Sequence, residues 1–422
     1  MALLVKNIRT LVHVESQPEP VIRGENMDRI VCLEHAYLLV EDGRIAAFGP
    51  EDDHLIDSLQ KKDPSLEVMD AGGGHLLPSW CDSHTHIVFA GSREQEFEDR
   101  IRGLSYQEIA SRGGGILQSA RRLRGASESE LFESAMKRVD EMVKGGTGAI
   151  EIKSGYGLDE ESELKMLRVI RRIGASVPFP VRATFLGAHA LPEEYRNDKA
   201  GYLRLLTDRL LPRIAEEGLA DYCDIFCEQG YFDPNDTRQL LKVAKGLGIK
   251  GKVHAEQLSH SGGILAGVDA GAESVDHLEY ADENDLKKLA GSTTIPVLLP
   301  GAQLFLGLKP PPAREMIDAG LPVALASDFN PGSSPSGNMN QMVSLACILY
   351  KMTPSEAIVA ATTNSAAAMG LSDKVGSIAV GKVANFFITH PIPSVGYLPY
   401  YFGQHQIATT VLNGKVVNSL ST

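Results

Sequence analysis

The middle of the chain alternates short apolar runs with longer segments of helical periodicity. The amphipathic stretches DEESELKMLRVIRRIG and DTRQLLKVAKGLG lie between runs rich in branched and aromatic residues. Strands that alternate with helices predict an α/β fold, and about eight such units are the number that closes a (β/α)8 TIM barrel. The eight apolar runs are SHTHIVFA, GAIEIKS, VRATFLGAH, YCDIFCE, KGKVHAE, ESVDHLE, TIPVLLP and PVALASD.

The two ends of the chain have a different pattern, in which short strand-like segments are joined by turn residues. LLVKNIRTLVHV and HAYLLVEDGRIAAFG lie near the start, and SIAVGKVANFFITH and ATTVLNGKVVNS lie near the end. Turns are expected at Asp42-Gly43, Gly381 and Asn413-Gly414. We expect the two ends to pair into one small β-sandwich domain. The predicted boundaries are 1–75 and 371–422 for the β-sandwich and 76–370 for the TIM barrel.

Composition narrows the class of protein. A length of 422 residues suits a barrel of roughly 250 to 300 residues with a smaller domain beside it. The net charge of −13, without any basic run, argues against nucleic-acid binding. Five cysteines without a CxxC pair favour reduced thiols and a cytoplasmic location, and no apolar segment is long enough to predict a membrane span.

Reactive side chains collect at the ends of the predicted strands. In TIM barrels the active site lies at the C-terminal ends of the strands, so this placement predicts one shared site. A histidine near a strand end is by itself more often a hydrogen-bonded core residue than a ligand, but the joint placement favours a site. The residues are His84 and His86 on the first run, Tyr156 after the second, His189 after the third, Glu228 after the fourth, His254 on the fifth, His277 on the sixth and Asp328 after the eighth.

Four of these residues predict a catalytic metal site. His84 and His86 point to the same face of a strand, because successive strand side chains alternate. Together with His254 and Asp328 they form a donor set of three imidazoles and one carboxylate, which suits a divalent ion with room for a water molecule. Such an ion lowers the pKa of its water to about 7, so metal-bound hydroxide could attack a carbonyl or amidine carbon.

The remaining polar groups are assigned to proton transfer and to the substrate. A carboxylate beside the metal-bound water can take its proton and pass it to the leaving nitrogen, which is the role expected for Asp328. His277 and His189 are then available to polarise or orient the substrate.

These residues resemble those of the amidohydrolase superfamily and, within it, the imidazolonepropionase family. The matching stretches are DSHTHIVFAGSREQEFEDR, SYQEIASRGGGI, IEIKSGYGLDEESELKMLR, FLGAHALPEEYR, VDHLEYA and SDFNPGSSP. The resemblance implies hydrolysis of the ring C–N bond of 4-imidazolone-5-propanoate to N-formimidoyl-L-glutamate, in histidine degradation. It also implies one divalent metal ion, Zn²⁺ or iron, and a homodimer.

The resemblance carries roles to particular substrate-binding positions. Arg93 would hold the propionate carboxylate, since a guanidinium group suits a bidentate contact. The alternative for Arg93 is a surface salt bridge with a neighbouring Glu. The other implied contacts are Tyr106 with the propionate, Tyr156 and His189 with the substrate, and Asn330, Gly332 and Ser333 with substrate and product.

The position of Gln257 departs from the pattern of related enzymes. Some relatives and many metal-dependent deaminases have Glu three residues after the histidine of the fifth strand, where this chain has Gln257. An amide cannot shuttle a proton. Gln257 is therefore counted among the catalytic residues as a hydrogen-bond partner of the substrate ring, and proton transfer is assigned to Asp328 and His277. Glu256 could substitute if the chain kinks there.

Three alternatives stay open at this point. Dihydropyrimidinase-like enzymes use a modified Lys on the fourth strand, but YCDIFCEQ contains none, which favours a single metal ion. A deaminase acting on a related ring would keep the Glu that is replaced by Gln257 and would release ammonia. A non-catalytic barrel could bind a metal or an anion, although its expected signature, a broken HxH or a lost Asp on the last strand, is not present.

Overall fold

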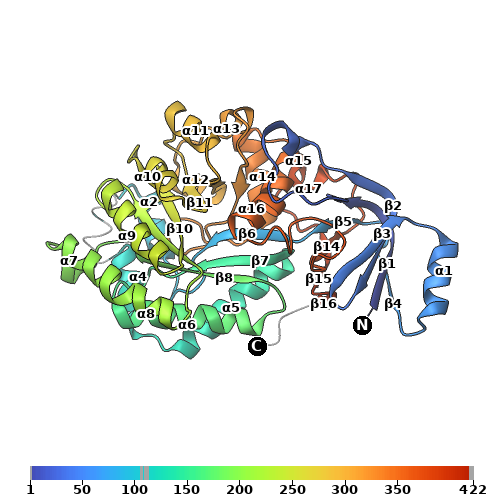
Figure 1. Cartoon of the computed structure of the whole chain (residues 1–422), viewed down its shortest axis with the longest axis horizontal. Helices are drawn as coiled ribbons and strands as arrows, with labels where there is room; N and C mark the ends of the chain where they lie inside the picture. Colours follow the sequence, from blue (N-terminus) through green and yellow to red (C-terminus); the bar gives the residue numbers. More distant parts are fainter. Residues whose placement is uncertain (1, 105–107, 109–113, 418–422) are drawn as a thin grey trace.

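The computed structural model describes residues 2–104, 108 and 114–417 and contains two sheets (Figure 1). One is a barrel of eight parallel strands in chain order, so the predicted fold class is confirmed. The barrel is nearly closed: the end of its first strand is joined to the segment after its last strand, where His86 N donates to Phe329 O (2.9 Å) and Asp328 N donates to His84 O (3.0 Å). Its strands are β6 (Trp80–Thr85), β7 (Thr147–Lys153), β8 (Val181–Ala188), β9 (Tyr222–Cys227), β10 (Lys250–Ala255), β11 (Ser274–His277), β12 (Ile295–Leu298) and β13 (Ala324–Leu325).

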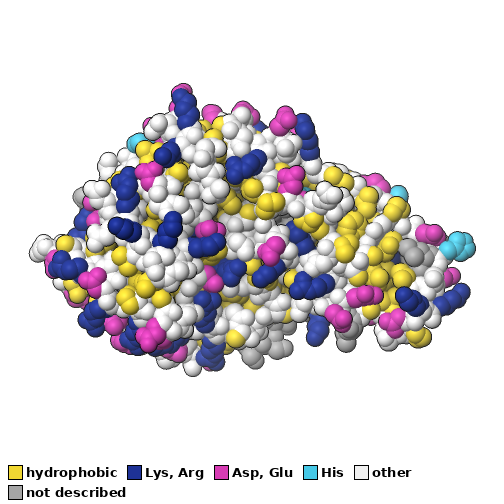
Figure 2. Space-filling view, viewed as in Figure 1, with side chains coloured by type: hydrophobic (Ala, Val, Ile, Leu, Met, Phe, Trp, Pro, Cys, Tyr) yellow, Lys and Arg dark blue, Asp and Glu magenta, His cyan; other side chains and the backbone are white. Residues whose placement is uncertain are grey.

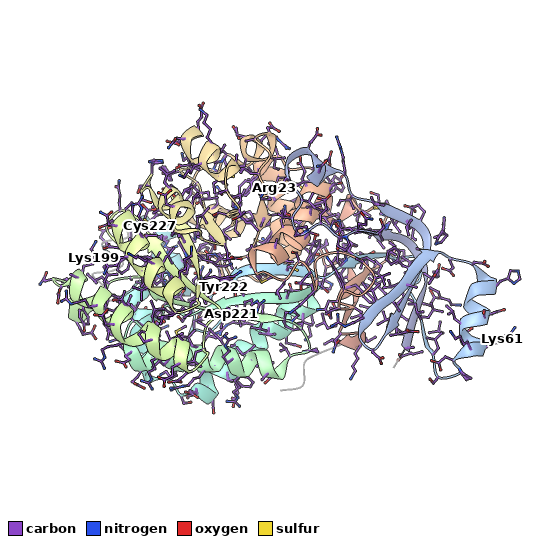
Figure 3. All side chains as sticks on the ribbon, viewed as in Figure 1. Arg23, Lys61, Lys199, Asp221, Tyr222 and Cys227 are labelled. Atoms are coloured by element: carbon purple, nitrogen blue, oxygen red, sulfur yellow. The ribbon has the colours of Figure 1, made fainter. Side chains whose placement is uncertain are left out.

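Each strand has two faces with different tasks. Ile150 and Ile152 of β7 belong to the buried apolar cluster outside the barrel wall, whereas Glu151 and Lys153 alternate with them and face the opposite side. Figure 3 shows Tyr222 and Cys227 at the two ends of β9. Because the strands are parallel, their C-terminal ends lie at the same end of the barrel. The site residues at these strand ends therefore lie close together.

Helices cover the outside of the barrel (Figure 1). The two predicted helices begin at capping residues: Asp159 accepts from Ser162 N before α6, and Asp233 forms a capping box before α9. In the described residues the α-helices are α1 (Asp53–Lys62), α2 (Glu94–Ile101), α4 (Ile116–Gly125), α5 (Glu128–Lys144), α6 (Glu160–Ser176), α7 (Lys199–Arg204), α8 (Leu211–Glu216), α9 (Pro234–Gly246), α10 (Gly263–Ala270), α11 (Glu283–Ala290), α12 (Pro300–Leu306), α13 (Ala313–Asp318), α14 (Met339–Tyr350), α15 (Pro354–Val359), α16 (Ser365–Ala368) and α17 (Tyr397–Tyr400).

The second sheet combines both ends of the chain, as predicted. Its strand order is β16-β15-β14-β5-β1-β2-β3, with β4 paired to β1. The Asp42-Gly43 and Asn413-Gly414 turns have positive φ at both residues, which is the geometry of tight two-residue hairpins. The strands are β1 (Ala2–Val12), β2 (Cys32–Glu41), β3 (Arg44–Pro50), β4 (Glu67–Asp70), β5 (His75–Pro78), β14 (Phe386–Thr389), β15 (Ile407–Leu412) and β16 (Lys415–Val417).

The predicted domain boundaries can be refined by sheet membership. Because β5 pairs with β1 and β14, we propose that the first boundary falls after Pro78 instead of after residue 75. The boundary at residue 371 stays a prediction.

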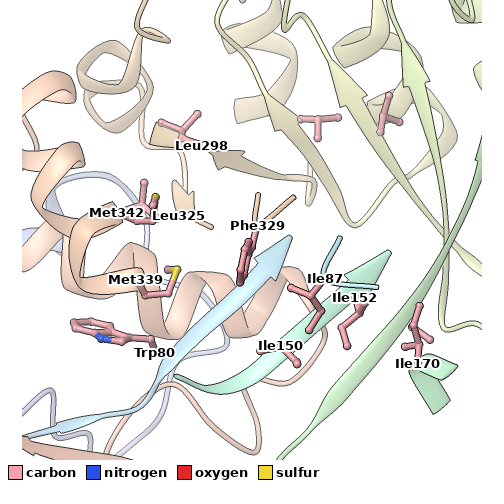
Figure 4. Close-up of a cluster of buried hydrophobic side chains, with 14 of the residues drawn as sticks. Trp80, Ile87, Ile150, Ile152, Ile170, Leu298, Leu325, Phe329, Met339 and Met342 are labelled. Atoms are coloured by element: carbon pink, nitrogen blue, oxygen red, sulfur yellow. The ribbon is translucent and has the colours of Figure 1, made fainter. Parts of the chain in front are cut away.

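The only tryptophan of the chain lies where the two sheets meet. Trp80 is fully buried, its ring centroid is 5.0 Å from that of Phe387 on β14, and its Nε1 donates to Asn340 Oδ1 (3.2 Å). Figure 4 shows Trp80 beside Met339, within the apolar cluster that continues along the barrel wall. The start of β6 is thus packed on both sides, which fixes the strand that carries His84 and leads into His86.

Three further observations concern the predictions on surface charge, cysteine state and membrane spans. Basic and acidic side chains are interspersed over the face shown in Figure 2. All five cysteines are free thiols. Within the residues that the structure describes, every helix is too short or too polar to cross a membrane.

Candidate active site

The four predicted metal ligands converge at the C-terminal end of the barrel. The Nε2 atoms of His84 and His86 are 3.2 Å apart, and Asp328 Oδ1 lies 3.6 Å from the first and 3.4 Å from the second. Ring nitrogens of His84, His86 and His254 all lie within 4.8 Å of one another. The four side chains are almost completely buried.

The spacing of three of the donor atoms fits a tetrahedral metal ion. Imidazole nitrogens bind zinc at 2.0–2.1 Å, which places neighbouring ligand atoms about 3.3 Å apart in a tetrahedron. The distances among His84, His86 and Asp328 are close to this value. In the described part of the chain, both ring nitrogens of His254 are buried without a hydrogen bond, and Asp224 Oδ2 lies 3.0 Å from Nδ1, so Nε2 is the nitrogen left for a metal.

Two carboxylates behind the ligands orient the imidazole rings. Asp276 Oδ2 lies 2.6 Å from His84 Nδ1, and Asp224 Oδ2 lies 3.0 Å from His254 Nδ1. A carboxylate can only accept at these positions, so it favours a proton on Nδ1 and leaves Nε2 for the ion. Burial, followed by neighbouring positive groups, holds the pKa of His84 well below its usual value. The ring is therefore neutral, as metal ligation requires.

Several site residues have left-handed backbone conformations. Asp328 has φ 52°, His277 has φ 89° and Leu278 has φ 71°. A positive φ is costly for a residue with a Cβ atom and persists where the surrounding structure enforces it. Of these residues, His277 ends β11 and Asp328 follows β13, and both line the pocket, whereas Leu278 belongs to the apolar core.

A pocket of about 360 Å³ opens above the ligands. Its size is within the ordinary range for a small-molecule site. Tyr156 and His189 lie on its wall, and the His189 ring stacks on His86 with a centroid distance of 5.3 Å and an interplanar angle of 18°. His189 Nδ1 lies 3.1 Å from Gly155 O, and burial lowers the pKa of His189 to about 3, so its ring is neutral.

The pocket wall contains two guanidinium groups. Arg93 lies at the start of α2 and pairs with Glu96 at 2.5 Å, so both interpretations of Arg93 apply: it forms a local salt bridge and it lines the pocket. Arg100 also lines the pocket, and its Nη1 donates to Gly332 O (3.1 Å). A Cβ atom at Gly332 would lie 2.3 Å from Arg93 Nη1. A side chain at this position would therefore displace the Arg93 guanidinium group from its place against the backbone.

The loop after β13 is held by an internal hydrogen-bond network. Asn330 Oδ1 accepts from Gly332 N and from Ser333 N, both at 2.8 Å, and Asn330 Nδ2 donates to Ser333 Oγ at 2.8 Å. Ser333 Oγ lies 3.4 Å from Asp328 Oδ2. All three loop residues line the pocket next to Asp328.

The structure distinguishes Gln257 from Glu256. Gln257 lines the pocket. The chain turns at Glu256, which has φ 50°, and the Glu256 carboxylate points to the start of α10, where it accepts from the backbone N–H groups of Gly262, Gly263 and Ile264. Glu256 therefore caps α10. The chain does turn at this residue, but the turn directs the carboxylate to the helix, and Glu256 does not line the pocket.

His277 has a buried carboxylate behind it. Glu279 Oε1 lies 3.9 Å from His277 Nδ1, and both side chains are almost fully buried. Burial opposes a charge on His277, but Glu279, Asp328 and Asp276 outweigh it and raise the pKa of His277. His277 lines the pocket and can donate a hydrogen bond there.

Other predicted residues lie elsewhere. The Glu228 carboxylate accepts from Leu258 N (2.8 Å) and supports the loop after β10 instead of lining the pocket. The predicted contact Tyr106 lies outside the described residues.

Sequence reasoning missed Arg100 and the carboxylates behind the ligands. Arg100 is seven residues after Arg93, about two helical turns, so the same face of α2 could have been examined for a second cation. Asp224 and Asp276 are single charges within apolar strand segments, and such a position indicates a buried carboxylate that needs a partner.

A second group of possible ligands, His260, Asp282 and Asp285, has a structural explanation. Asp282 and Asp285 form the capping box of α11, and His260 Nε2 lies 3.1 Å from Asp285 Oδ2. Their positions follow from the helix start.

Comparisons with known proteins identify relatives of the whole chain. A model described as the amidohydrolase family matches residues 75–417. The imidazolonepropionase of Christiangramia forsetii is 52% identical over 420 residues, which are 99% of this chain and 100% of that protein. That of Geobacillus kaustophilus is 40% identical over 415 residues, covering 98% of this chain and 97% of that protein.

Solved structures show the same fold. The guanine deaminase of E. coli superposes with a TM-score of 0.74 at 15% identity, covering 100% of both chains. An adenosine deaminase from Xanthomonas campestris with bound zinc gives a TM-score of 0.69 at 17% identity, covering 99% of this chain and 93% of that one. At such identities the likeness concerns the fold alone.

Proposed function

The chain belongs to the amidohydrolase family, and we propose that it hydrolyses the ring C–N bond of 4-imidazolone-5-propanoate to N-formimidoyl-L-glutamate, a step of histidine degradation. The observation that carries this proposal is the pocket itself, which has a candidate metal centre at its floor and Arg93 on its wall. A substrate with a reactive ring and a carboxylate side chain matches this pocket, because the ring can lie at the metal centre and the carboxylate at Arg93. The near full-length identity to imidazolonepropionases supports the same reaction.

The donor set defines the expected metal chemistry. We propose that His84, His86, His254 and Asp328 hold one divalent ion, and this set suits zinc and iron alike. When bound, the ion supplies hydroxide at neutral pH by lowering the pKa of a water molecule to about 7.

Asp328 is the proposed proton carrier. Its Oδ1 faces the imidazole ligands, and its Oδ2 faces Ser333 in the loop that lines the pocket. One carboxylate therefore borders both the ligand cluster and the substrate. Accepting a proton from the water and passing it to the ring nitrogen lets the C–N bond break without forming a free amide anion.

His277 and Gln257 act on the ring. The carbonyl oxygen gains negative charge as the carbon becomes tetrahedral, and a donor aimed at that oxygen stabilises the charge. His277 is suited to this because it lines the pocket and its ring N–H can donate a hydrogen bond. Gln257 can donate or accept one hydrogen bond to the ring.

Arg93 and its neighbours set the position of the substrate. Its guanidinium group binds the propionate carboxylate, while Tyr156 and His189 contact the ring from the wall. Holding the side chain in this way brings the ring carbonyl over the ligands. A cytoplasmic location and a homodimer stay predictions from the free thiols and from the family resemblance, respectively.

Removing the metal is expected to abolish turnover. Protein treated with a chelator and then desalted should hydrolyse the substrate no faster than its spontaneous decay, because the remaining groups cannot generate hydroxide at neutral pH. Adding one equivalent of Zn²⁺ or Fe²⁺ should restore the rate, and the more effective ion identifies the cofactor. Full turnover by metal-free protein would rule out the proposed chemistry, and release of ammonia would favour a deaminase.

A further inference from the structure

Charged side chains fill the inside of the barrel beneath the ligands. Barrel interiors are usually packed with branched apolar side chains. Among the described residues, the fully buried charged side chains of the interior include Glu151, Lys153, Asp224, Lys252 and Asp276. Buried charges are costly unless they are paired, so each of them needs a partner in the network.

Lys153 has the central position in this network. Its Nζ lies 2.8 Å from Asp224 Oδ2, 3.6 Å from Asp276 Oδ2 and 2.7 Å from Glu151 Oε1. The same two aspartate oxygens contact His254 Nδ1 and His84 Nδ1. One ammonium group thus connects the two carboxylates that orient two of the three imidazole ligands.

We propose that Lys153 is a positioning residue of the metal centre, which couples His84 to His254 by holding Asp276 and Asp224 in place. This inference rests on the metal centre of the proposed function. Without the ammonium group the two carboxylates would lose their shared partner and repel each other across the barrel interior. The imidazole rings would then lose the fixed orientation that slows the departure of the ion.

The chain provides a matched control in Lys252. Lys252 is equally buried, and its Nζ contacts the other oxygen of Glu151. It lies over the Tyr222 ring at 4.8 Å. Among the described residues no ion pair joins Lys252 to Asp224 or Asp276. Replacing either lysine removes one buried cation from the same network, but only Lys153 contacts the carboxylates behind the ligands.

The test compares Lys153→Met with Lys252→Met in zinc-loaded full-length protein. The rate of zinc transfer to a chromogenic chelator is measured, and circular dichroism reports folding. Lys153→Met should lose zinc about 10- to 100-fold faster than wild type, the usual range for groups behind metal ligands. Lys252→Met should stay within about 3-fold. Equal effects of the two variants, or none from Lys153→Met, would overturn the proposal.

A second measurement applies if Lys153→Met does not fold. With Lys153 in place, zinc loss is compared for Asp224→Asn, Asp276→Asn and the double variant. Coupling through Lys153 predicts that the double variant departs at least about 3-fold from the product of the single effects. Multiplicative effects would overturn the proposal. Wild-type protein that does not retain zinc or iron would instead contradict the proposed function, so the two failures are distinguishable.

Discussion

Asp328→Asn is expected to lower kcat by about 10²- to 10⁴-fold, the range that general acid–base groups contribute. Asparagine keeps the size of the side chain and one oxygen for the ion but cannot accept and return a proton. The measurement is steady-state turnover at about pH 7.5, together with the metal content of each protein. The kcat values of variant and wild type are then compared with the metal site fully occupied in both.

Glu256→Gln is the matched control for Asp328→Asn. It also neutralises a buried carboxylate at a strand end, but that carboxylate caps α10 outside the pocket lining. It should leave kcat within a few-fold of wild type if the protein folds. Comparable losses in both variants, or a metal-loaded Asp328→Asn with normal kcat, would show that Asp328 is not the proton carrier.

Arg93→Ala is expected to raise KM about 10- to 100-fold with little change in kcat. The estimate follows from a hydrogen bond to a charged group, which contributes about 1.5–3 kcal/mol. The propionate carboxylate is remote from the bond that breaks, so its binding is nearly equal in the ground state and the transition state. Initial rates over a wide substrate range separate the two constants.

Two controls sharpen the Arg93 prediction. Arg122→Ala removes an exposed arginine whose Nη1 donates to Ser92 O (3.0 Å) outside the pocket lining, and it should leave KM unchanged. A substrate analogue without the carboxylate should bind wild type and Arg93→Ala equally weakly. If the analogue still distinguishes the two proteins, Arg93 acts through its pair with Glu96 and does not bind the carboxylate.

The fold followed from local patterns in the sequence. Asp42-Gly43 and Asn413-Gly414 predicted hairpins because few residues tolerate positive φ, and both are found as expected. The barrel followed from the alternation of apolar runs with amphipathic helices, confirmed by parallel pairing from β6 to β13. The positions of the candidate metal ligands at the predicted strand ends then predicted one shared site before any distance was known.

The supporting groups were not predictable in the same way. Lys153, Asp224 and Asp276 come from three strands, and their contacts depend on register and on which face of each strand points inward. The role of Glu256 was not predictable either. The sequence left a role in proton transfer open, but the positive φ at Glu256 directs its carboxylate to the start of α10. Periodicity predicts faces, whereas pairing across the barrel requires the three-dimensional structure.

The most direct measurement is turnover of freshly prepared 4-imidazolone-5-propanoate by metal-loaded protein, with ring absorbance followed over time and the product identified by mass. The account predicts loss of the ring at a rate far above spontaneous decay and a product heavier by one water molecule, N-formimidoyl-L-glutamate. Persistence of the ring while the metal stays bound would contradict it.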